Sequence, residues 1–518
     1  MTSQESITKK DQSVVDINEI NSKDELIQNS NSLFAKAEDI AAKYADILKD
    51  GYTKAEERKI LWKCDMFLIP FLWLNVTFAA MDKVSNGTAS IYGMQTDLNL
   101  VGNQYSWIGS SFYFGYLFWC FPSSVILQKL PVAKVAGCCF FVWGIILIGS
   151  GFAKNFQTMV ACRVLLGISE APIVPINLII MSIWYKRGPE QSIRLGLFYT
   201  GLSTIFTGTI GYAVGGYTDV KYSPWRYFIW IIGSLSSVYG LLEFFLLPDS
   251  PVSCRYLNER EKAIVIDRVR KNQTGVKNTK FKKEQFFQTF KDPKVWIMVA
   301  IQLFISIPNG GLTNFSPLIV NGLGWSSRDS TLLTMPTGIM QTVSVYMASG
   351  TLALLEKFFK KKHFRGAVLC FYLLPAFVGT GCLYKLPLTW YRSRLVSLYF
   401  GFFYLGSYII SLNLIAANHA GFTRKVTANA IYFLTYAVSN LIAPQFFKTS
   451  QSPTYTLGVA AIFGAYALTI VSVLLYMVVC WRENKRRDKL YGEAPEENRE
   501  TDFSDMTDID NINFRYKW

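Results

Sequence analysis

Four charged residues stand within or at the edge of long apolar stretches of this chain. Asp82 and Lys83 close one apolar run, and Arg163 and Glu170 interrupt another. A charge at the centre of a bilayer costs about 2.5–3.5 kcal/mol on insertion scales, so charges kept there commonly face water-filled cavities. The four residues therefore predict a path for an ion or a charged solute.

The residue types indicate two kinds of chemistry. Lys83 and Arg163 supply positive charge, and we predict both as binding residues for an anionic substrate. Asp82 and Glu170 are carboxylates, and desolvation favours the protonated form of a carboxyl group. We therefore predict Asp82 and Glu170 as proton-coupling residues. Competition between Arg163 and a substrate anion for one carboxylate would couple the two fluxes.

Helix geometry predicts how these residues meet. At 1.5 Å per residue, Asp82 and Arg163 both lie about 8–9 Å below the outer surface, where they could pair. Glu170 lies two turns beyond Arg163 on nearly the same face, about 10 Å closer to the centre. Asp82 and Lys83 point about 100° apart and can serve different partners. Two structural interpretations are also open. The first pair could be interfacial, and Arg163 and Glu170 could form a static network.

The composition defines the elements that must position these residues. Of the 518 residues, 51% are hydrophobic and 17% are charged, and successive runs of about 20 apolar residues predict an all-α polytopic membrane protein with twelve transmembrane helices in two six-helix halves. The predicted spans are 64–84, 106–127, 132–152, 157–181, 193–215, 225–247, 295–320, 331–355, 364–384, 393–415, 426–447 and 456–480.

Charge distribution predicts the topology and the domains. Lys and Arg gather in alternate loops and after the last span, whereas 84–105 contains neither, so both termini are predicted to be cytoplasmic. This pattern also argues that the net charge of +15 does not reflect nucleic-acid binding. We find no cleavable signal peptide at the polar N-terminus. The predicted domains are a cytoplasmic tail (1–60), a first half (61–247), a cytoplasmic linker (248–294), a second half (295–481) and a cytoplasmic tail (482–518).

Local motifs add four smaller predictions. Thr53 with Glu56, and Asn258 with Glu261, are spaced as helix-capping boxes. Pro172 and Pro175 should bend the fourth span just past Glu170, and the acidic tail 488–518 is predicted to be mobile. The sequon Asn86-Gly87-Thr88 is placed on the outer side, close to the membrane.

The second half is polar but almost uncharged within its spans. Its seventh span carries Pro308, Gly310, Gly311 and Pro317, which predict an interrupted helix lining a cavity. Amide side chains there and in later spans are predicted to bind the substrate by hydrogen bonds. His419, near the inner end of the tenth span, is a minor candidate for the same role. The predicted amide residues are Asn309, Asn314, Gln341 and Asn413.

Several chemistries are not expected. Nine Cys and two His residues lack metal-ligand spacing, so we predict no metal site and no disulfide framework. We see no nucleophile–base set and no phosphate loop, and therefore predict neither an enzyme nor a cofactor.

Several stretches resemble the fungal allantoate permease family, in the anion:cation symporter branch of the major facilitator superfamily. They are MDKVSNGTA (81–89), FPSSVILQKLPVAK (121–134), RVLLGISEAPIVPINLIIMSIWYKRGPEQSIRLGLFYTG (163–201), LPDSPVSCRYLNEREK (247–262), NHAGFTRKVTANA (418–430) and DMTDIDNINFRY (505–516). The resemblance spans most of 50–518 and supports the fold derived above.

The resemblance also implies roles for the charged residues. In related organic-anion symporters, an acid–base pair of the first helix and an Arg and a Glu of the fourth serve proton coupling and anion binding. These correspond to Asp82, Lys83, Arg163 and Glu170. Lys83 stands where those symporters usually have Arg, which disfavours bidentate carboxylate binding. The seventh span has Asn309 and Asn314 instead of a further Arg, which favours a monoanion or a zwitterion over a dicarboxylate.

The sequence thus predicts a monomeric proton symporter that imports a small organic anion: a monocarboxylate, a vitamin or an amino-acid-like compound. Its partners are this substrate, protons and the lipid bilayer. Known substrates of the family include allantoate, ureidosuccinate, dipeptides, nicotinate, pantothenate, biotin and cysteine. The plasma membrane is the first expectation, with the endoplasmic reticulum or vacuole as alternatives. A non-transporting nutrient sensor, or an exporter or intracellular carrier of the same fold, are the alternative functions.

Overall fold

The computed structural model describes residues 47–48, 51–127, 130–186, 190–191, 194, 201–217, 221–270, 282–359, 364–492 and 506–518. Across these ranges the chain forms helices and turns without a β-strand. Predictions that concern the N-terminal residues 1–46 and residues 271–281 of the linker lie outside the described residues.

The helices form two sets in chain order, which we call the first half and the second half. The first half comprises α2 (Lys54–Ala89), η1 (Ser90–Met94), α3 (Gln95–Asp97), α4 (Gln104–Ile126), α5 (Val132–Ser150), α6 (Phe156–Glu170), α7 (Ile173–Trp184), α9 (Leu202–Val214) and α10 (Pro224–Leu246). The second half comprises α13 (Pro293–Asn321), α14 (Ser327–Phe358), α15 (Arg365–Lys385), α16 (Tyr391–Gly401), α17 (Tyr404–Ala417), α18 (Phe422–Ile442), η3 (Ala443–Phe446), η4 (Thr449–Gln451) and α19 (Thr456–Tyr491).

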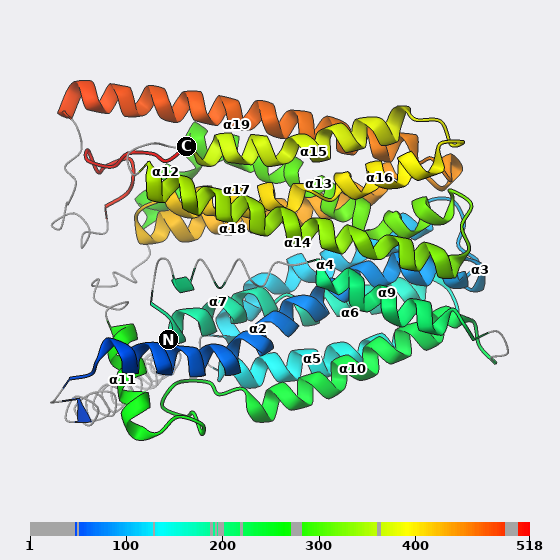
Figure 1. The fold of residues 1–518 in the computed structure, drawn as a ribbon, viewed down its shortest axis with the longest axis horizontal. Helices are drawn as coiled ribbons and strands as arrows, with labels where there is room; N and C mark the ends of the chain where they lie inside the picture. Colours follow the sequence, from blue (N-terminus) through cyan, green and yellow to red (C-terminus); the bar gives the residue numbers. More distant parts are fainter. Residues whose placement is uncertain are drawn as a thin grey trace, which may run out of the picture.

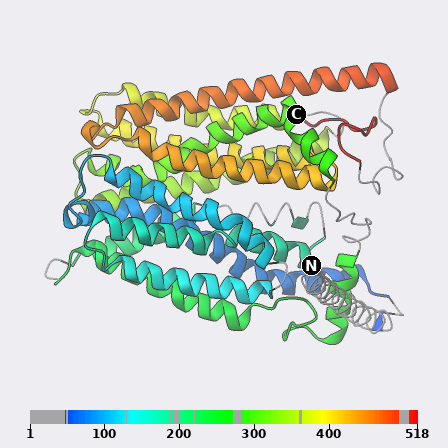
Figure 2. The ribbon, with the colours of Figure 1, turned by 180° about the vertical axis from the view of Figure 1, so that it is seen from behind.

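The two halves lie side by side with their long helices nearly parallel (Figure 1), and the view from behind shows the same arrangement (Figure 2). The linker between them carries two short helices, α11 (Glu259–Arg270) and α12 (Lys283–Lys291). These helices, the start of α2 and the C-terminus lie at one end of the bundle, which we call the terminus end; the opposite end is the far end.

Length and composition agree with the predicted membrane fold. Among the described residues, ten helical segments are long and apolar enough to cross a membrane. Two more helices, α9 and α4, take the places of the fifth and second predicted spans. The all-α, twelve-helix prediction is therefore confirmed.

Both predicted capping boxes are present. Thr53 Oγ1 accepts a hydrogen bond from the Glu56 N–H, and the Glu56 carboxylate accepts one from the Thr53 N–H. Asn258 and Glu261 make the same reciprocal pair at the start of α11. Each box satisfies backbone donors that the first helical turn leaves free.

The first span is longer than predicted. Helix α2 continues past residue 84 to Ala89 and then runs through η1 and α3 to Asp97. Asn86 is 1% exposed and bonds to Arg163 and Asn314 inside the bundle. The prediction that the sequon lies on the outer side, beyond the end of the first span, is wrong because Asn86, Gly87 and Thr88 are buried within α2. Asp82 also lies deeper along its helix than we predicted.

The fourth span bends where the prolines predict. Helix α6 ends at Glu170, and α7 begins at Ile173 directly after Pro172. A proline interrupts the hydrogen-bond ladder of the preceding turn. The break leaves Glu170 at the end of its helical segment, facing α2.

The seventh span is one helix, so the predicted interruption is wrong. Helix α13 runs without a break through Pro308 and Pro317. Neighbouring helices bond to carbonyl groups close to each proline: Ser439 Oγ donates to the Leu303 carbonyl at 2.7 Å, and Tyr105 Oη donates to the Asn314 carbonyl at 2.8 Å. Such bonds from neighbours allow proline within membrane helices.

The two halves are closed against each other at the far end. Asn86 donates to Asn314 Oδ1 at 3.2 Å, and Tyr92 bonds to Thr331 at 3.0 Å. Ser106 also donates to the Phe447 carbonyl at 3.0 Å. All of these residues lie in the far-end portions of their segments. We call this contact the far-end seam.

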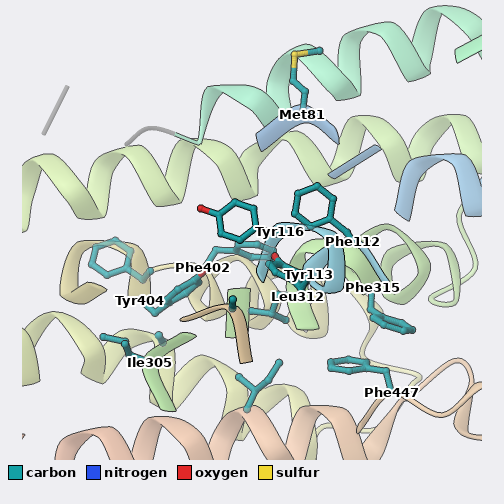
Figure 3. Close-up of a cluster of buried hydrophobic side chains, with 14 of the residues drawn as sticks. Met81, Phe112, Tyr113, Tyr116, Ile305, Leu312, Phe315, Phe402, Tyr404 and Phe447 are labelled. Atoms are coloured by element: carbon teal, nitrogen blue, oxygen red, sulfur yellow. The ribbon is translucent and has the colours of Figure 1, made fainter. Parts of the chain in front are cut away.

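A buried hydrophobic cluster continues the seam inward (Figure 3). It brings Phe112, Tyr113 and Tyr116 of α4 together with Leu312 and Phe315 of α13. Phe315 in turn stacks on Phe447, with ring centroids 4.4 Å apart. The core of the molecule thus includes the contact between the halves as well as the interior of each half.

The C-terminal tail is only partly what its acidic composition predicted. Residues 493–505 lie outside the described residues, but 506–518 pack against the second half, and Asp508 is fully buried. The prediction of a mobile segment is wrong for 506–518, because its Asp508 pairs with the buried Arg424 of the second half.

Candidate functional site

Asp82 and Arg163 form a buried ion pair between α2 and α6. Arg163 Nη1 donates to Asp82 Oδ1 at 3.0 Å, with side-chain exposures of 5% and 0%. Arg163 Nη2 donates to Asn86 Oδ1, also at 3.0 Å. The guanidinium therefore bonds to two residues one turn apart on α2, and Asn86 links the pair to Asn314 in the second half.

Lys83 and Glu170 form a second ion pair beside the first. Lys83 Nζ lies 2.7 Å from Glu170 Oε1 and 5.4 Å from the centroid of the Phe112 ring. The Glu170 side chain is 3% exposed, whereas that of Lys83 is 21% exposed. Tyr436 of the second half is an electrostatic neighbour of Lys83. The accessible cation of the cluster therefore lies between the halves.

Helix geometry explains why the pairs form side by side. Neighbouring residues on a helix point about 100° apart, so Asp82 and Lys83 reach different partners. Arg163 and Glu170 are seven residues apart on α6 and lie on nearly the same face. The cluster holds two cations and two anions. Asp82 Oδ2, Arg163 Nε and Glu170 Oε2 have no hydrogen-bond partner among the described residues, so each pair is held through few bonds.

Close packing of α4 on α6 presents these charges to α2. A Cβ at Gly115 would lie 1.9 Å from the Val164 carbonyl oxygen, and one at Gly167 would lie 2.0 Å from that of Phe112. Both distances are shorter than any normal contact, so only glycine permits this approach. The two glycines set the distance from which α6 presents Arg163 and Glu170.

Gly115→Val should therefore lower the stability of the protein. Overpacking a well-packed interior costs about 1–3 kcal/mol, and here the obstacle is backbone. Thermal unfolding of the purified protein should show a lower midpoint. Gly149→Val near the end of α5 is the matched control, because a Cβ there meets nothing within 4 Å. Equal midpoints for both variants would show that α4 and α6 do not need this approach.

The second half brings Asn309 toward the site. Asn309 Nδ2 donates to Tyr436 Oη and to Asn440 Oδ1, each at 2.9 Å, and Tyr404 Oη donates to Asn309 Oδ1 at 3.3 Å. Since Tyr436 also neighbours Lys83, this neutral polar group faces the charged cluster across the boundary between the halves.

The other predicted amide residues lie elsewhere. Asn314 is part of the far-end seam, with Asn86 and with Tyr105. Gln341 is half-buried in α14, and Asn413 is half-buried in α17, where its side chain donates to the Ile409 carbonyl at 3.2 Å. Among the described contacts, neither Gln341 nor Asn413 meets the four charged residues.

Sequence reasoning missed three contributors. Asn86 lies one turn beyond Asp82 on the same face, and this spacing could have revealed it had the helix not been ended too early. Tyr436 and Asn440 gave no signal, because their place depends on packing between the halves. His419 bonds to the Ile415 carbonyl and to Tyr432 near the terminus end, and burial lowers the pKa of this imidazole.

A further acidic residue lies buried in the first half without joining the site. Glu243 Oε1 accepts a hydrogen bond from Asn75 at 2.9 Å, and Asn75 also donates to Asn177. Asn75 is seven residues before Asp82, so this polar layer lies two turns nearer the terminus end. Among the described residues, no group of three or more His, Cys, Asp or Glu side chains could hold a metal ion.

Comparison with known proteins agrees with this architecture. The family model described as Major Facilitator Superfamily matches residues 72–444. The allantoate permease of Saccharomyces cerevisiae is 34% identical over 92% of this chain and 90% of its own. An uncharacterised transporter of Schizosaccharomyces pombe is 33% identical over 98% of both chains.

Solved structures show the same fold. A bacterial homologue of the human lysosomal transporter Spinster, in an inward-facing conformation, matches with a TM-score of 0.59 and 14% identity, over 82% of this chain and 97% of its own. The D-xylose-proton symporter matches with a TM-score of 0.56 and 13% identity, over 80% and 96%.

The fold and the matching family model define a transporter of the major facilitator superfamily. The similarity along nearly the whole chain narrows this class, and the protein belongs to the fungal allantoate permease family of that superfamily.

Proposed function

We propose that this protein imports a small organic anion together with protons. The observation that carries the proposal is the pair of neighbouring ion pairs, Asp82–Arg163 and Lys83–Glu170, within the first half of a major facilitator transporter. The S. cerevisiae relative is named for allantoate, a carboxylate, and one structural neighbour is named as a proton symporter.

The cluster provides a route to coupling. While Glu170 is ionised, it occupies Lys83 at 2.7 Å and neutralises it. A proton on Glu170 removes that negative charge and leaves Lys83 free to attract an anion. A bound substrate carboxylate then takes the place of Glu170 next to Lys83. The substrate anion and the proton are transported together, with no net charge. Release of the proton restores the Lys83–Glu170 pair and expels the anion.

The surroundings of Lys83 support a monoanionic substrate. Lys83 is a single ammonium group and binds an anion as a point charge rather than by a planar fork. Across from it, Asn309 and Tyr436 offer neutral hydrogen-bonding groups. One carboxylate at Lys83 and a polar or zwitterionic body at Asn309 fit this arrangement. This favours a monocarboxylate, a vitamin or an amino-acid-like compound.

The closed far-end seam supports alternating access. The halves meet through Asn86–Asn314 and Tyr92–Thr331 at the far end, while Lys83 between them keeps 21% of its side chain exposed. We propose that the terminus end is cytoplasmic, that the protein acts as a monomer in the plasma membrane, and that transport alternates by closing the terminus end as the seam opens.

Glu170→Gln tests the coupling. The amide cannot take up the proton, so cells expressing this variant should lose accumulation of labelled carboxylates driven by a proton gradient. Exchange of the same compound between the two sides needs no net proton movement and should survive. The measurement is uptake of a panel of labelled carboxylates, with and without a protonophore, followed by counterflow of the compound that is taken up.

The matched control is Glu243→Gln, which makes the same change at a buried position of the first half that bonds to Asn75 rather than to a cation. It should keep accumulation. Full accumulation by the Glu170 variant would remove Glu170 from coupling. If the protonophore does not reduce uptake by the wild-type protein, proton symport itself is rejected.

A further inference from the structure

The last 13 residues, 506–518, are bound at the terminus end of the second half through one fully buried carboxylate. Arg424 Nε donates to Asp508 Oδ1 at 2.7 Å, and Arg424 Nη2 donates to Asp508 Oδ2 at 3.2 Å. Both side chains are 0% exposed. Tyr516 Oη and the Ala420 N–H also donate to this carboxylate, at 2.9 and 3.2 Å. These hydrogen bonds of the Asp508 side chain are all made inside the protein.

The backbone of the segment is bound as closely as the carboxylate. Arg487 of α19 is 3% exposed, and its Nη1 donates to the carbonyl oxygens of Asp508, Asn511 and Phe514, each at 3.0 Å. Asn484 bonds to both the N–H and the carbonyl of Tyr516. Asn418 bonds to the Lys517 N–H and carbonyl in the same way. The second half thus presents a site shaped for this segment of its own chain.

The segment joins elements that are distant in sequence. Arg424 lies in the first turn of α18 and also pairs with Asp292, the N-cap of α13. Gln285 of α12 accepts a hydrogen bond from the Thr423 N–H at 3.2 Å, and Gln288 donates to Asp510 at 3.2 Å. Asn418, in the turn between α17 and α18, bonds to Tyr476 of α19. Linker, turn and last helix therefore meet around the bound tail.

We propose that residues 506–518 are a latch that fixes the linker helix α12 and the α17–α18 turn to α19, and that negative charge at Thr507 opens it. If the latch leaves its site, Arg487 loses its three carbonyl partners and Arg424 keeps only Asp292. Arg487 also keeps its ion pair with Glu483, so neither arginine is left without a carboxylate. Both lose most of their hydrogen bonds together, and an unsatisfied buried donor is unfavourable, so docking and release should occur as one cooperative step rather than residue by residue.

Thr507 is placed to control this step. It is 0% exposed, and its hydroxyl donates to Asp510 Oδ2 at 2.7 Å. Its methyl group faces the turn, 3.0 Å from where a Cβ on Gly421 would lie. A phosphate on Thr507 would lie next to Asp508 and Asp510 and would have to be desolvated, so like-charge repulsion would oppose docking. Thr507 is therefore a modification site that is reachable only when the latch is open.

Hydrogen–deuterium exchange of the full-length protein tests the latch. Asp508→Asn removes the charge that pairs with Arg424, and amides of 506–518 and α12 should exchange at least about tenfold faster than in the wild type. Lys517→Gln is the control. It also removes one charge from the segment, at an exposed side chain of a residue that bonds to Asn418 through its backbone, and should leave exchange within about twofold. Equal rates for wild type and Asp508→Asn would overturn the latch.

Thr507→Asp tests the charge switch separately. The new carboxylate should raise exchange in 506–518 by at least about tenfold, whereas Thr507→Ser, which keeps the hydroxyl bond to Asp510, should not. Exchange in the first-half helices α5 and α10 should stay unchanged in both variants, which separates latch opening from global unfolding. Slow exchange in Thr507→Asp would overturn the role of Thr507. Fast exchange in α5 and α10 of Asp508→Asn or of Thr507→Asp would also overturn the proposal, because the segment would then stabilise the whole fold rather than act as a separate latch.

Discussion

Arg163→Ala is expected to abolish transport and to destabilise the protein. The change leaves Asp82, which is 0% exposed, without its cation, and it removes a bond that holds Asn86 at the seam. Breaking one partner out of a buried ion pair costs about 3–5 kcal/mol. Thermal unfolding of purified protein should therefore show a clearly lower midpoint, and uptake of labelled carboxylates should fall to the level of cells without the protein.

The double variant Asp82→Asn with Arg163→Gln separates function from stability. It removes both charges together and leaves amides that can still bond to Asn86, so the midpoint should recover toward that of the wild type. Uptake should stay lost, because the pair takes part in the transport cycle. If the double variant regains both stability and transport, the Asp82–Arg163 pair is a static structural contact and has no direct part in coupling.

The helix count could be predicted from hydropathy, but the end of the first helix could not. Residues 82–97 include Asp82, Asn86, Ser90 and Asp97, and so read as a polar loop after the span. In the structure, most of their side chains face protein instead of lipid or water, and Asn86 bonds to both halves. A hydropathy average measures how well a stretch suits a lipid environment. It therefore places the end of a helix too early where the polar side chains of that helix face the protein interior.

The site was partly predictable for a related reason. Asp82 and Arg163 belong to helices that cross at similar depth, and a fixed rise of 1.5 Å per residue is enough to bring them level. The partner of Lys83 and the place of Tyr436 were not predictable, because they depend on the rotation of α6 and on how the second half docks. Gln341 and Asn413 have the residue type for binding, but among the described contacts neither meets the four charged residues.

The C-terminal latch shows that the composition of a segment is not enough to predict whether that segment is mobile. The composition of an acidic segment, taken alone, predicts that the segment is mobile, because like charges repel and few apolar groups are available. Asp508 is buried only because Arg424 and Arg487 come from elements 84 and 21 residues away along the chain. These arginines lie in a predicted loop and a predicted tail, where sequence gave them no partner.

Lys83→Gln is expected to weaken substrate binding more than it weakens folding. Lys83 is the partly exposed cation of the site, with its Nζ 2.7 Å from Glu170. A hydrogen bond to a charged group contributes about 1.5–3 kcal/mol, so the concentration for half-maximal uptake should rise about ten- to a hundredfold. Lys154→Gln, at an exposed position outside the site, is the control for a lost positive charge and should leave uptake unchanged.

Lys83→Arg then tests why the site carries lysine. Arginine keeps the charge but offers a planar fork that binds a carboxylate at two points. Competition by monocarboxylates and dicarboxylates against the labelled substrate should shift toward the dicarboxylates, since the fork holds the substrate carboxylate that displaces Glu170 at two points instead of one. An unchanged competition profile would mean that the substrate carboxylate does not meet residue 83. The anion site would then have to be built on Arg163, which is available only after the Asp82 pair opens.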